Sequence, residues 1–327
     1  MATLKVKIIG SGSYLPSRIV TNADVEKELF LDDPKPVDWV ERRTGIKERR
    51  WSDWNKDDES LFGMAINAAN SALKEAGVDD VDIISVARGR FTDPKSIIIA
   101  SAVQEGLKKR GYKMKDVDYL DGFYICSGSV TALYEAGVRI AIGDCKRALV
   151  VGSSRTSYYC NSESPGTAFL WGDGAGAWIL ERSEDPGILA YKGKGFSDKW
   201  NVLQSRADCS GKLYVKMDGP AVFEGVVKNA PEIVMKTLGE AGVSLSDIDL
   251  FICHQANLRI IEGICKRLYV SMERFFVDVD KYGNTSCASV PIAYDDAKKQ
   301  GKIRPGYLYA LIGFGAGLHI NCAIYRA

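Results

Sequence analysis

The chain has 327 residues, enough for one large domain or two domains of ordinary size. Its 46% hydrophobic and 26% charged residues are typical of a globular protein with a sizeable core, which excludes global disorder. The formal net charge of +1 lacks the basic excess typical of a protein that binds duplex nucleic acid, so nucleic acid is not an expected partner.

The predicted elements alternate between short β-branched strands and longer helices, which is typical of an α/β fold. In chain order, a strand at 6–9 enters a turn at 10–12, and an amphipathic helix follows at 60–77. Buried strands are expected at 82–86 and at 147–151. No low-complexity segment or long linker interrupts this alternation.

An internal repeat indicates how the chain is divided. The segment 73–84 contains Glu-Ala-Gly-Val followed by an apolar run, and the same pattern recurs at 238–251. Each copy predicts a helix closed by a glycine, a short loop and a buried strand. We therefore expect two similar α/β halves, residues 1–184 and 185–327, which meet where Ser-Glu-Asp-Pro-Gly breaks the pattern. Coincidence is the alternative, because Glu-Ala-Gly-Val is common at helix ends.

The cysteines and the apolar runs indicate the cellular compartment of the protein. The eight cysteines are scattered and include no CxxC pair, so neither a metal site nor a redox pair is expected. There is no signal-peptide pattern, and no apolar run is long enough to span a bilayer. We therefore expect a cytoplasmic protein with reduced cysteines and no contact with a membrane.

One cysteine, Cys126, lies where a strand is expected to turn into a helix. The residues at 130–142 have helical periodicity, and Gly143 ends the pattern. Backbone N–H groups and the positive end of the helix dipole stabilise a thiolate at such a position, so we expect the pKa of Cys126 to lie below its ordinary ~8.5. This position makes Cys126 the candidate nucleophile, with a buried and inert cysteine as the alternative.

Histidine is scarce, which narrows any proposal that involves proton transfer. The chain contains only His254 and His319. His254 directly follows the strand of the second repeat, and ligands of open α/β sheets gather beyond the carboxyl ends of strands. This position favours a functional histidine over the alternative of a satisfied structural one. Asn284 follows Gly283, a pair that by itself indicates no more than a turn.

Two glycine-rich segments carry further predictions. The segment 313–318 follows an expected strand at 307–312 and can bring backbone N–H groups close to a ligand. The segment 172–177 is expected to be a tight turn between strands. Neither segment opens a helix in the dinucleotide-binding pattern, so we exclude a dinucleotide cofactor.

Motifs along nearly the whole chain resemble those of the thiolase superfamily, and most closely its β-ketoacyl-acyl-carrier-protein synthase III branch. The motifs that carry the resemblance are Gly10–Pro16, Thr21–Asp24, Arg43–Arg50, Cys126–Gly128, Gly172–Ala177, Met217–Gly219, His254–Ile261 and Gly283–Ser286. Each motif is weak alone, and their shared order makes the resemblance specific. It implies an α/β fold of the thiolase type, with five αβαβα layers made of two duplicated βαβαβαββ halves, and a homodimer.

The same resemblance implies an acyltransferase that performs a decarboxylative Claisen condensation in fatty-acid biosynthesis or a related pathway. A primer thioester on coenzyme A or acyl carrier protein would acylate Cys126, and malonyl-acyl carrier protein would then lose carbon dioxide and attack the acyl group. His254 and Asn284 would donate hydrogen bonds to the enolate oxygen, and the backbone N–H groups of Cys126 and Ala316 would form the oxyanion hole. No metal or cofactor is implied beyond the thioester carriers.

The resemblance also implies which residues bind the two carriers. The family positions that bind the substrate or coenzyme A are matched by Trp39, Arg43, Gly219 and Phe223. The positions that contact the acidic acyl carrier protein lie on an expected helix at 257–268 and are matched by Arg259, Lys266 and Arg267. An ordinary solvated helix face is the alternative for these three cations.

Three departures from the family pattern point to a specialised primer. Pro165 stands where relatives commonly have an arginine that helps hold the adenine of coenzyme A, which leaves the primer's carrier open. Phe123–Ile125 are bulkier than the residues common before the nucleophile and would reshape the acyl pocket. Arg88 and Arg90 follow a strand and would pair with an anionic primer, although exposed loop arginines are the simpler interpretation.

Three other functions stay open at this point. A non-decarboxylating acyltransferase would pass the acyl group from Cys126 to a hydroxyl or amine, but it would have less need of Asn284. A thiolase proper would carry a second catalytic cysteine in the last glycine-rich segment, where this chain has Ala316. A thiolase-fold accessory or binding protein would not become acylated at all.

Overall fold

Two β-sheets with a helical layer between them form the centre of the molecule. The computed structural model describes residues 3–30, 37–89, 98–122, 124–162, 164–208 and 210–327. The five-stranded first sheet has the order β1 (Val6–Tyr14), β7 (Asp173–Arg182), β6 (Arg147–Arg155), β4 (Ile83–Arg88) and β5 (Asp118–Gly122). The four-stranded second sheet has the order β11 (Leu250–Cys253), β12 (Leu308–Gly315), β13 (His319–Arg326) and β8 (Ile188–Gly195).

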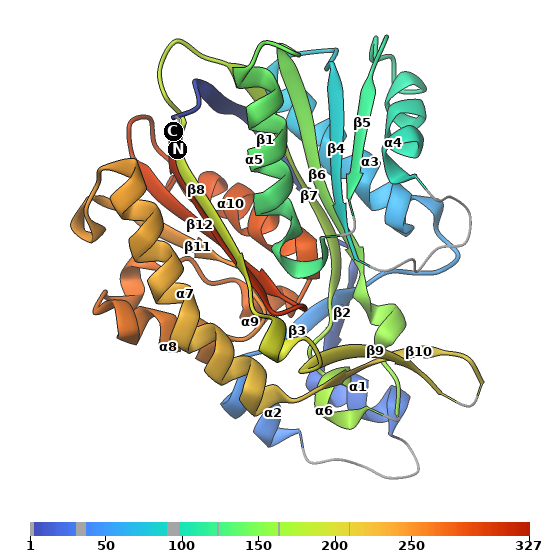
Figure 1. Ribbon diagram of the computed structural model, residues 1–327. Helices are drawn as coiled ribbons and strands as arrows, with labels where there is room; N and C mark the ends of the chain where they lie inside the picture. The colour runs from blue at the N-terminus through green and yellow to red at the C-terminus, as the bar shows by residue number, and fades with distance from the viewer. Residues whose placement is uncertain (1–2, 31–36, 90–97, 123, 163, 209) are drawn as a thin grey trace.

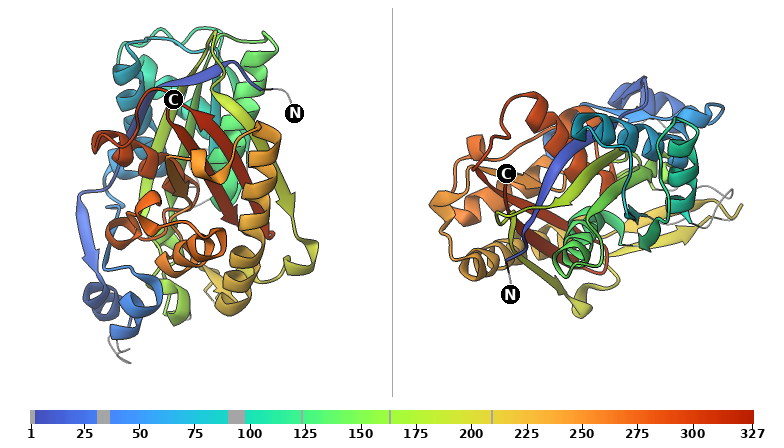
Figure 2. Two further views of the ribbon diagram at one scale, coloured as in Figure 1. Left: turned by 90° about the vertical axis from the view of Figure 1, so that its left-hand side faces the viewer. Right: turned by 90° about the horizontal axis from the view of Figure 1, so that it is seen from above.

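Helices complete a five-layer αβαβα arrangement, which Figure 1 shows from left to right. On the outer faces, α7 (Gly219–Ala241) and α8 (Leu258–Leu268) cover the second sheet, and α3 (Leu61–Ala76) and α4 (Ile99–Lys108) cover the first. Between the sheets lie α5 (Gly128–Ala141) and α10 (Ser289–Lys299), as the view from above in Figure 2 also shows. Buried apolar side chains from both sheets and both middle helices form one core there. The predicted five-layer fold is confirmed.

The two halves repeat the same order of elements. The first contains β1, α3, β4, α4, β5, α5, β6 and β7, and the second contains β8, α7, β11, α8, α10, β12 and β13. The place of β5 is held in the second half by Phe275, which forms a single parallel β-bridge with Phe251. The helix of each predicted repeat ends at a left-handed glycine, Gly77 (φ 65°) and Gly242 (φ 68°). The helix, glycine and strand predicted twice from the sequence are therefore present in both halves.

The glycine-rich segments differ from their predicted form. β1 continues through 10–12, β7 includes most of 172–177, and β12 extends to Gly315. The turns predicted at the first two places are therefore wrong, and the last loop is shorter than expected. The physical reason is the close approach of other elements, because a Cβ added at Gly176 would lie 2.7 Å from the backbone nitrogen of Ile292 in α10. Glycine inside a strand commonly marks such a contact.

Smaller elements cover one end of the five layers, at the bottom of Figure 1. They are β2 (Arg18–Thr21), α1 (Asn22–Leu29), α2 (Asp38–Thr44), β3 (Glu48–Trp51), α6 (Pro165–Ala168), β9 (Leu203–Ala207), β10 (Leu213–Met217) and α9 (Val279–Tyr282). Arg49 is fully buried among them and donates to the Asn22 side-chain oxygen (2.6 Å) and to the Phe169 carbonyl (2.6 Å), which ties these elements together. Within the described ranges, no helix is both long and apolar enough to cross a bilayer.

Candidate active site

Cys126 lies in a strained turn between β5 and α5. A 3-10 turn, η2 (Ile125–Ser127), joins the two elements, and Ile125 has a φ of 52°. A β-branched residue rarely has a positive φ, so the surroundings must hold this turn in place. One such contact comes from β12, where a Cβ added at Gly315 would lie 2.6 Å from the Cβ of Cys126. The Cys126 side chain is 5% exposed and lines two cavities.

The Cys126 thiol differs from its predicted state. Burial raises its pKa to about 11, and a hydrogen bond with the Ser286 hydroxyl, 3.4 Å from Sγ, offsets only part of this rise. The predicted lowering of the pKa by the helix N-terminus is therefore wrong, because the loss of solvation outweighs the favourable position. Cys126 consequently holds its proton at neutral pH.

His254 directly follows β11 and is buried. Burial lowers the pKa of its imidazole to about 3, so the ring is neutral at physiological pH. Its Nδ1 lies 2.5 Å from the Ser289 hydroxyl oxygen, which also accepts a hydrogen bond from the Gln255 N–H (3.3 Å). Within the described residues the Ser289 hydroxyl has no other acceptor, so its proton is satisfied only by Nδ1, and this arrangement favours a ring proton on Nε2. His254 can thus donate a hydrogen bond from Nε2.

Asn284 lies in the predicted turn, directly after α9 and Gly283 (φ 61°). Its backbone is held on both sides, since its N–H donates to the Leu170 carbonyl (2.7 Å) and its carbonyl accepts from the Gly172 N–H (3.1 Å). Its side-chain oxygen accepts a hydrogen bond from the Ser286 N–H (2.8 Å). This bond leaves the side-chain NH₂ group as a donor that does not titrate.

Cys126, His254 and Asn284 meet on the wall of one cavity of about 360 Å³. The first half of the chain supplies the thiol, and the second half supplies the imidazole and the amide. The same cavity is lined by the residues expected to bind the substrate, which are Trp39 and Arg43 on α2 and Gly219 and Phe223 on α7. Among the residues that the structure describes, no cluster of histidine, cysteine and acidic side chains is placed to hold a metal ion.

The three cations expected to contact a carrier protein lie in different places. Arg259 lines this cavity, whereas Lys266 and Arg267 are exposed in the last turn of α8. The Arg259 guanidinium pairs with Glu262 (2.8 Å) and donates from Nε to the Arg42 carbonyl (2.9 Å). Glu262 therefore offsets part of the positive charge at this end of the cavity.

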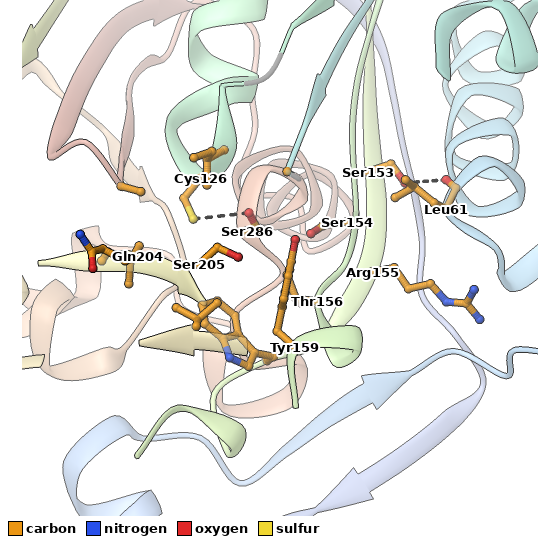
Figure 3. Close-up of a pocket in the computed structure, with 16 residues that line it drawn as sticks. Leu61, Cys126, Ser153, Ser154, Arg155, Thr156, Tyr159, Gln204, Ser205 and Ser286 are labelled. Carbon is orange, nitrogen blue, oxygen red and sulfur yellow. Dashed lines mark hydrogen bonds between the residues drawn. The ribbon is translucent and has the colours of Figure 1, made fainter. Parts of the chain in front are cut away.

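A second cavity, of about 470 Å³, also opens at Cys126 (Figure 3). Its wall includes Ile125, Ser153, Ser154, Ser205, Ser286 and Ala316. Ser153 and Ser154 were not predicted as site residues, because their strand was expected to end at 151, whereas β6 continues to Arg155. The signal that was present is the run of polar residues that follows the apolar part of this strand. Ala316, expected in the oxyanion hole, lies on the same wall as Cys126.

Arg88 is not an exposed loop residue. It is buried at the end of β4, and its Nε donates to the Asp121 carboxylate (2.5 Å). It lines neither of the two cavities. The exposed-loop interpretation of Arg88 is therefore wrong. The anionic-primer interpretation stays a prediction, against which the ion pair with Asp121 counts. Arg90 lies outside the described residues.

The bulky residues before the nucleophile contribute unequally to the cavity walls. Ile125 lines the 470 Å³ cavity, whereas Tyr124 lines neither cavity and donates from its hydroxyl to Glu135 (2.6 Å). Phe123 lies outside the described residues. Pro165 forms the first residue of α6 and lines neither cavity.

Comparison with known proteins identifies the family. The model of the 3-oxoacyl-[acyl-carrier-protein] synthase III C-terminal region matches residues 238–327, and the model of 3-oxoacyl-[acyl-carrier-protein] synthase III matches residues 120–194. The β-ketoacyl-[acyl-carrier-protein] synthase III 1 of Vibrio vulnificus is 38% identical over 327 residues, which cover 98% of this chain and 99% of that protein. The chain belongs to the β-ketoacyl-acyl-carrier-protein synthase III family.

Solved structures of similar proteins agree with this assignment. The synthase III of Aquifex aeolicus has a TM-score of 0.88 and 37% identity, with 98% of this chain and 100% of that chain covered. A priming β-ketosynthase from a polyketide biosynthetic pathway has a TM-score of 0.89 and 29% identity, with 99% and 96% covered. This family member is therefore a condensing enzyme of the thiolase fold and an acyltransferase, as the resemblance predicted.

Proposed function

We propose that this protein joins a primer acyl group to malonyl-acyl carrier protein, and that Cys126, His254 and Asn284 carry the reaction. The observation that supports this most is the meeting of a thiol, a neutral imidazole and a side-chain amide on one cavity wall. Fixed donors beside a nucleophile suit a reaction in which negative charge develops on a thioester oxygen.

In the first step, the Cys126 sulfur attacks the carbonyl carbon of the primer thioester. The carrier's sulfur leaves and takes up the proton of the Cys126 thiol, so that an acyl-cysteine and a free carrier thiol result. The backbone N–H groups of Cys126 and Ala316 are the proposed oxyanion donors, and both residues line the 470 Å³ cavity. This cavity, which we name the acyl cavity, would hold the primer chain.

In the second step, malonyl-acyl carrier protein loses its carboxylate as carbon dioxide. The electron pair of the broken bond forms an enolate, whose oxygen accepts hydrogen bonds from His254 Nε2–H and the Asn284 NH₂ group. The enolate carbon then attacks the acyl group on Cys126. The Cys126 sulfur leaves and takes up a proton from solvent, and the product is a β-ketoacyl thioester on acyl carrier protein.

The carriers are proposed to reach Cys126 through the 360 Å³ cavity. Trp39 and Phe223 offer aromatic surface there, and Arg43 and Arg259 offer positive charge to the phosphate of a phosphopantetheine arm. Acyl carrier protein is the proposed partner, and the primer arrives on it or on coenzyme A. A homodimer, a cytoplasmic location and halves at 1–184 and 185–327 belong to the same proposal. The composition of the two sheets supports this division, since each takes its strands from one side of that boundary.

The proposal is tested by intact-protein mass after incubation with acyl-coenzyme A and acyl-carrier-protein thioesters. We expect acylation of the wild-type protein and none of Cys126→Ala. Malonyl-acyl carrier protein should then release carbon dioxide and yield a β-ketoacyl product. Transfer to a hydroxyl or amine without carbon dioxide would support the simple acyltransferase instead. Failure of every thioester to acylate the protein would contradict a catalytic role.

A further inference from the structure

Hydroxyl groups from three separate elements line the acyl cavity. Ser154 at the end of β6, Ser205 on β9 and Ser286 in the 3-10 turn η7 (Ser286–Ala288) come from three separate elements. Figure 3 shows these side chains arranged around the same space beside Cys126. Leu203 and other apolar residues supply wall between them. The cavity therefore combines an apolar wall with converging hydroxyls.

The hydroxyl of Ser154 differs from those of its neighbours in and after β6. Ser153 Oγ donates to the Leu61 carbonyl (2.8 Å), and Thr156 Oγ1 donates to the Asn284 carbonyl (3.2 Å). Ser154 is 4% exposed, and its hydroxyl has no hydrogen-bond partner in the part of the chain that the structure describes. Of these three hydroxyls, only that of Ser154 is therefore available to a ligand.

A plain alkyl chain in the acyl cavity would remove the Ser154 hydroxyl from water without offering it a partner. A buried unpaired hydroxyl is unfavourable, and a site that hydrogen-bonds a substrate oxygen discriminates against the analogue that lacks it. We propose that the acyl cavity selects primers that carry a neutral oxygen function, a hydroxyl or keto group, and that Ser154 recognises it. This inference rests on the proposed function, because it assigns the primer chain to this cavity.

Among the residues that the structure describes, the arginines near the acyl cavity favour a neutral group over a carboxylate. Arg155 belongs to the wall, but Figure 3 shows its guanidinium turned away from Cys126. Its Nε donates to the Ser52 hydroxyl (2.6 Å), and its guanidinium carbon lies 3.4 Å from the ring centre of Trp54. Arg88 is held in β4 by its ion pair. Neither arginine is therefore placed to meet an anionic primer.

The test compares acylation rates of Cys126 for primers of equal chain length. Butanoyl, 3-hydroxybutanoyl, 3-oxobutanoyl and succinyl thioesters, and the corresponding six-carbon set with the oxygen at carbon 3 or 5, are offered on coenzyme A and on acyl carrier protein. Intact-protein mass follows the reaction in time. We expect wild type to react about tenfold faster with the best hydroxyacyl or ketoacyl primer than with its alkyl counterpart, the size expected of one neutral hydrogen bond.

Substitutions then locate the selectivity. Ser154→Ala should bring the rate ratio of oxygenated to alkyl primer close to one, and Ser154→Thr, which keeps the hydroxyl, should retain it. Ser153→Ala is the matched control, since the Ser153 hydroxyl is already bonded, and it should change both rates by the same factor. A ratio that Ser154→Ala leaves unchanged would overturn the assignment of Ser154.

The wild-type protein alone can also refute the inference. Equal or faster acylation by alkyl primers would overturn the selection of an oxygen function, while leaving the proposed function intact. Preference for the succinyl primer would overturn the choice of a neutral group. No acylation by any member of the panel would refute the proposed function, and this inference with it.

Discussion

The two halves of the molecule each place a cysteine in the same turn. In the first half, η2 precedes α5 and contains Cys126, and in the second half, η7 precedes α10 and contains Cys287. Each turn begins with a non-glycine residue of positive φ, Ile125 in one and Ser286 in the other, both at 52°. The duplication therefore extends to the backbone conformation before the two central helices.

The surroundings of the two sulfurs nevertheless differ. Cys287 is 0% exposed, and its Sγ lies within hydrogen-bonding distance of the carbonyls of Ala87 (3.3 Å) and Ser153 (3.4 Å). Cys126 instead lines both cavities. Burial raises the pKa of both thiols, to about 12 for Cys287 and to about 11 for Cys126. Both thiols therefore share the position before a helix N-terminus, and what separates them is that Cys126 lines the cavities.

The residues at the ends of corresponding strands also differ between the two halves in whether they line a cavity. β4 of the first half ends at Arg88, whose guanidinium is engaged by the Asp121 carboxylate. The corresponding β11 of the second half is followed by His254, which lines the 360 Å³ cavity. One half therefore presents the candidate nucleophile, and the other presents the two candidate donors.

The largest expected effect separates the two cysteines. Cys126→Ala should abolish acylation and lower condensation by on the order of 10⁶-fold, as removal of a catalytic nucleophile commonly does. Cys287→Ala should remain acylated at Cys126, because Cys287 lines neither cavity. Acylation is measured by intact mass, and thermal unfolding of both variants checks that they are folded. Loss of acylation in a folded Cys287→Ala protein would contradict the proposed difference between the two cysteines.

The second-largest expected effect concerns the enolate donor that the second half supplies. Asn284→Ala should lower the condensation rate by about 10²–10³-fold, the usual cost of one oxyanion donor, and should leave acylation of Cys126 nearly unchanged. The donor acts on the enolate, which forms only after acylation. Single-turnover acylation and carbon dioxide release are measured separately. Equal loss in both steps would show that Asn284 does not act on the enolate alone.

A third prediction concerns the glycines through which β7 and α10 pack. Gly176→Ala should lower the free energy of unfolding by about 2–3 kcal/mol, because its Cβ would lie 2.7 Å from the Ile292 backbone nitrogen. Gly239→Ala in α7 is the matched control, since a Cβ there has no neighbour within 4 Å. It should raise the free energy of unfolding by about 0.5–1 kcal/mol. Denaturant unfolding gives both values, and equal effects would contradict the close packing.

The fourth prediction follows from the pKa of Cys126. The thiolate fraction rises with pH while the pH stays below the raised pKa of about 11. If the thiolate attacks the primer, the acylation rate should therefore rise about tenfold for each pH unit between about pH 6 and about pH 9. His254, whose pKa is about 3, stays neutral throughout and should add no acidic limb. A rate that is flat over this range would show that the thiol is deprotonated by its environment before attack.

The smallest expected effect concerns the carrier. Arg259→Glu should raise the KM for malonyl-acyl carrier protein several-fold at low salt, and added salt should reduce the difference. Malonyl-coenzyme A serves as the comparison substrate, and Glu262→Gln, which frees Arg259 from its ion pair, should lower the KM. An unchanged KM at low salt in both variants would remove Arg259 from the carrier contact.

Sequence patterns predicted the α/β class, the repeated helix and strand, and the positions of Cys126, His254 and Asn284 at element boundaries. These features depend on local periodicity and on motifs of a few residues. The catalytic roles of the three residues stay predictions, which their meeting on one cavity wall supports. The glycines of 172–177 were misassigned to a turn because a glycine that permits a turn also permits a neighbouring helix to approach closely.

By itself, the sequence determined the two-fold order of elements and the chemical groups available for catalysis, because composition and spacing are properties of the chain. Tertiary structure alone decided which cysteine lines a cavity, whether Arg88 forms an ion pair with Asp121, and which protonation states Cys126 and His254 have. These outcomes depend on burial and on distances between the two halves. The atoms that bury a side chain come from parts of the chain far away in sequence. At Cys126, the rise in pKa that this burial causes outweighs the lowering expected from the helix N-terminus.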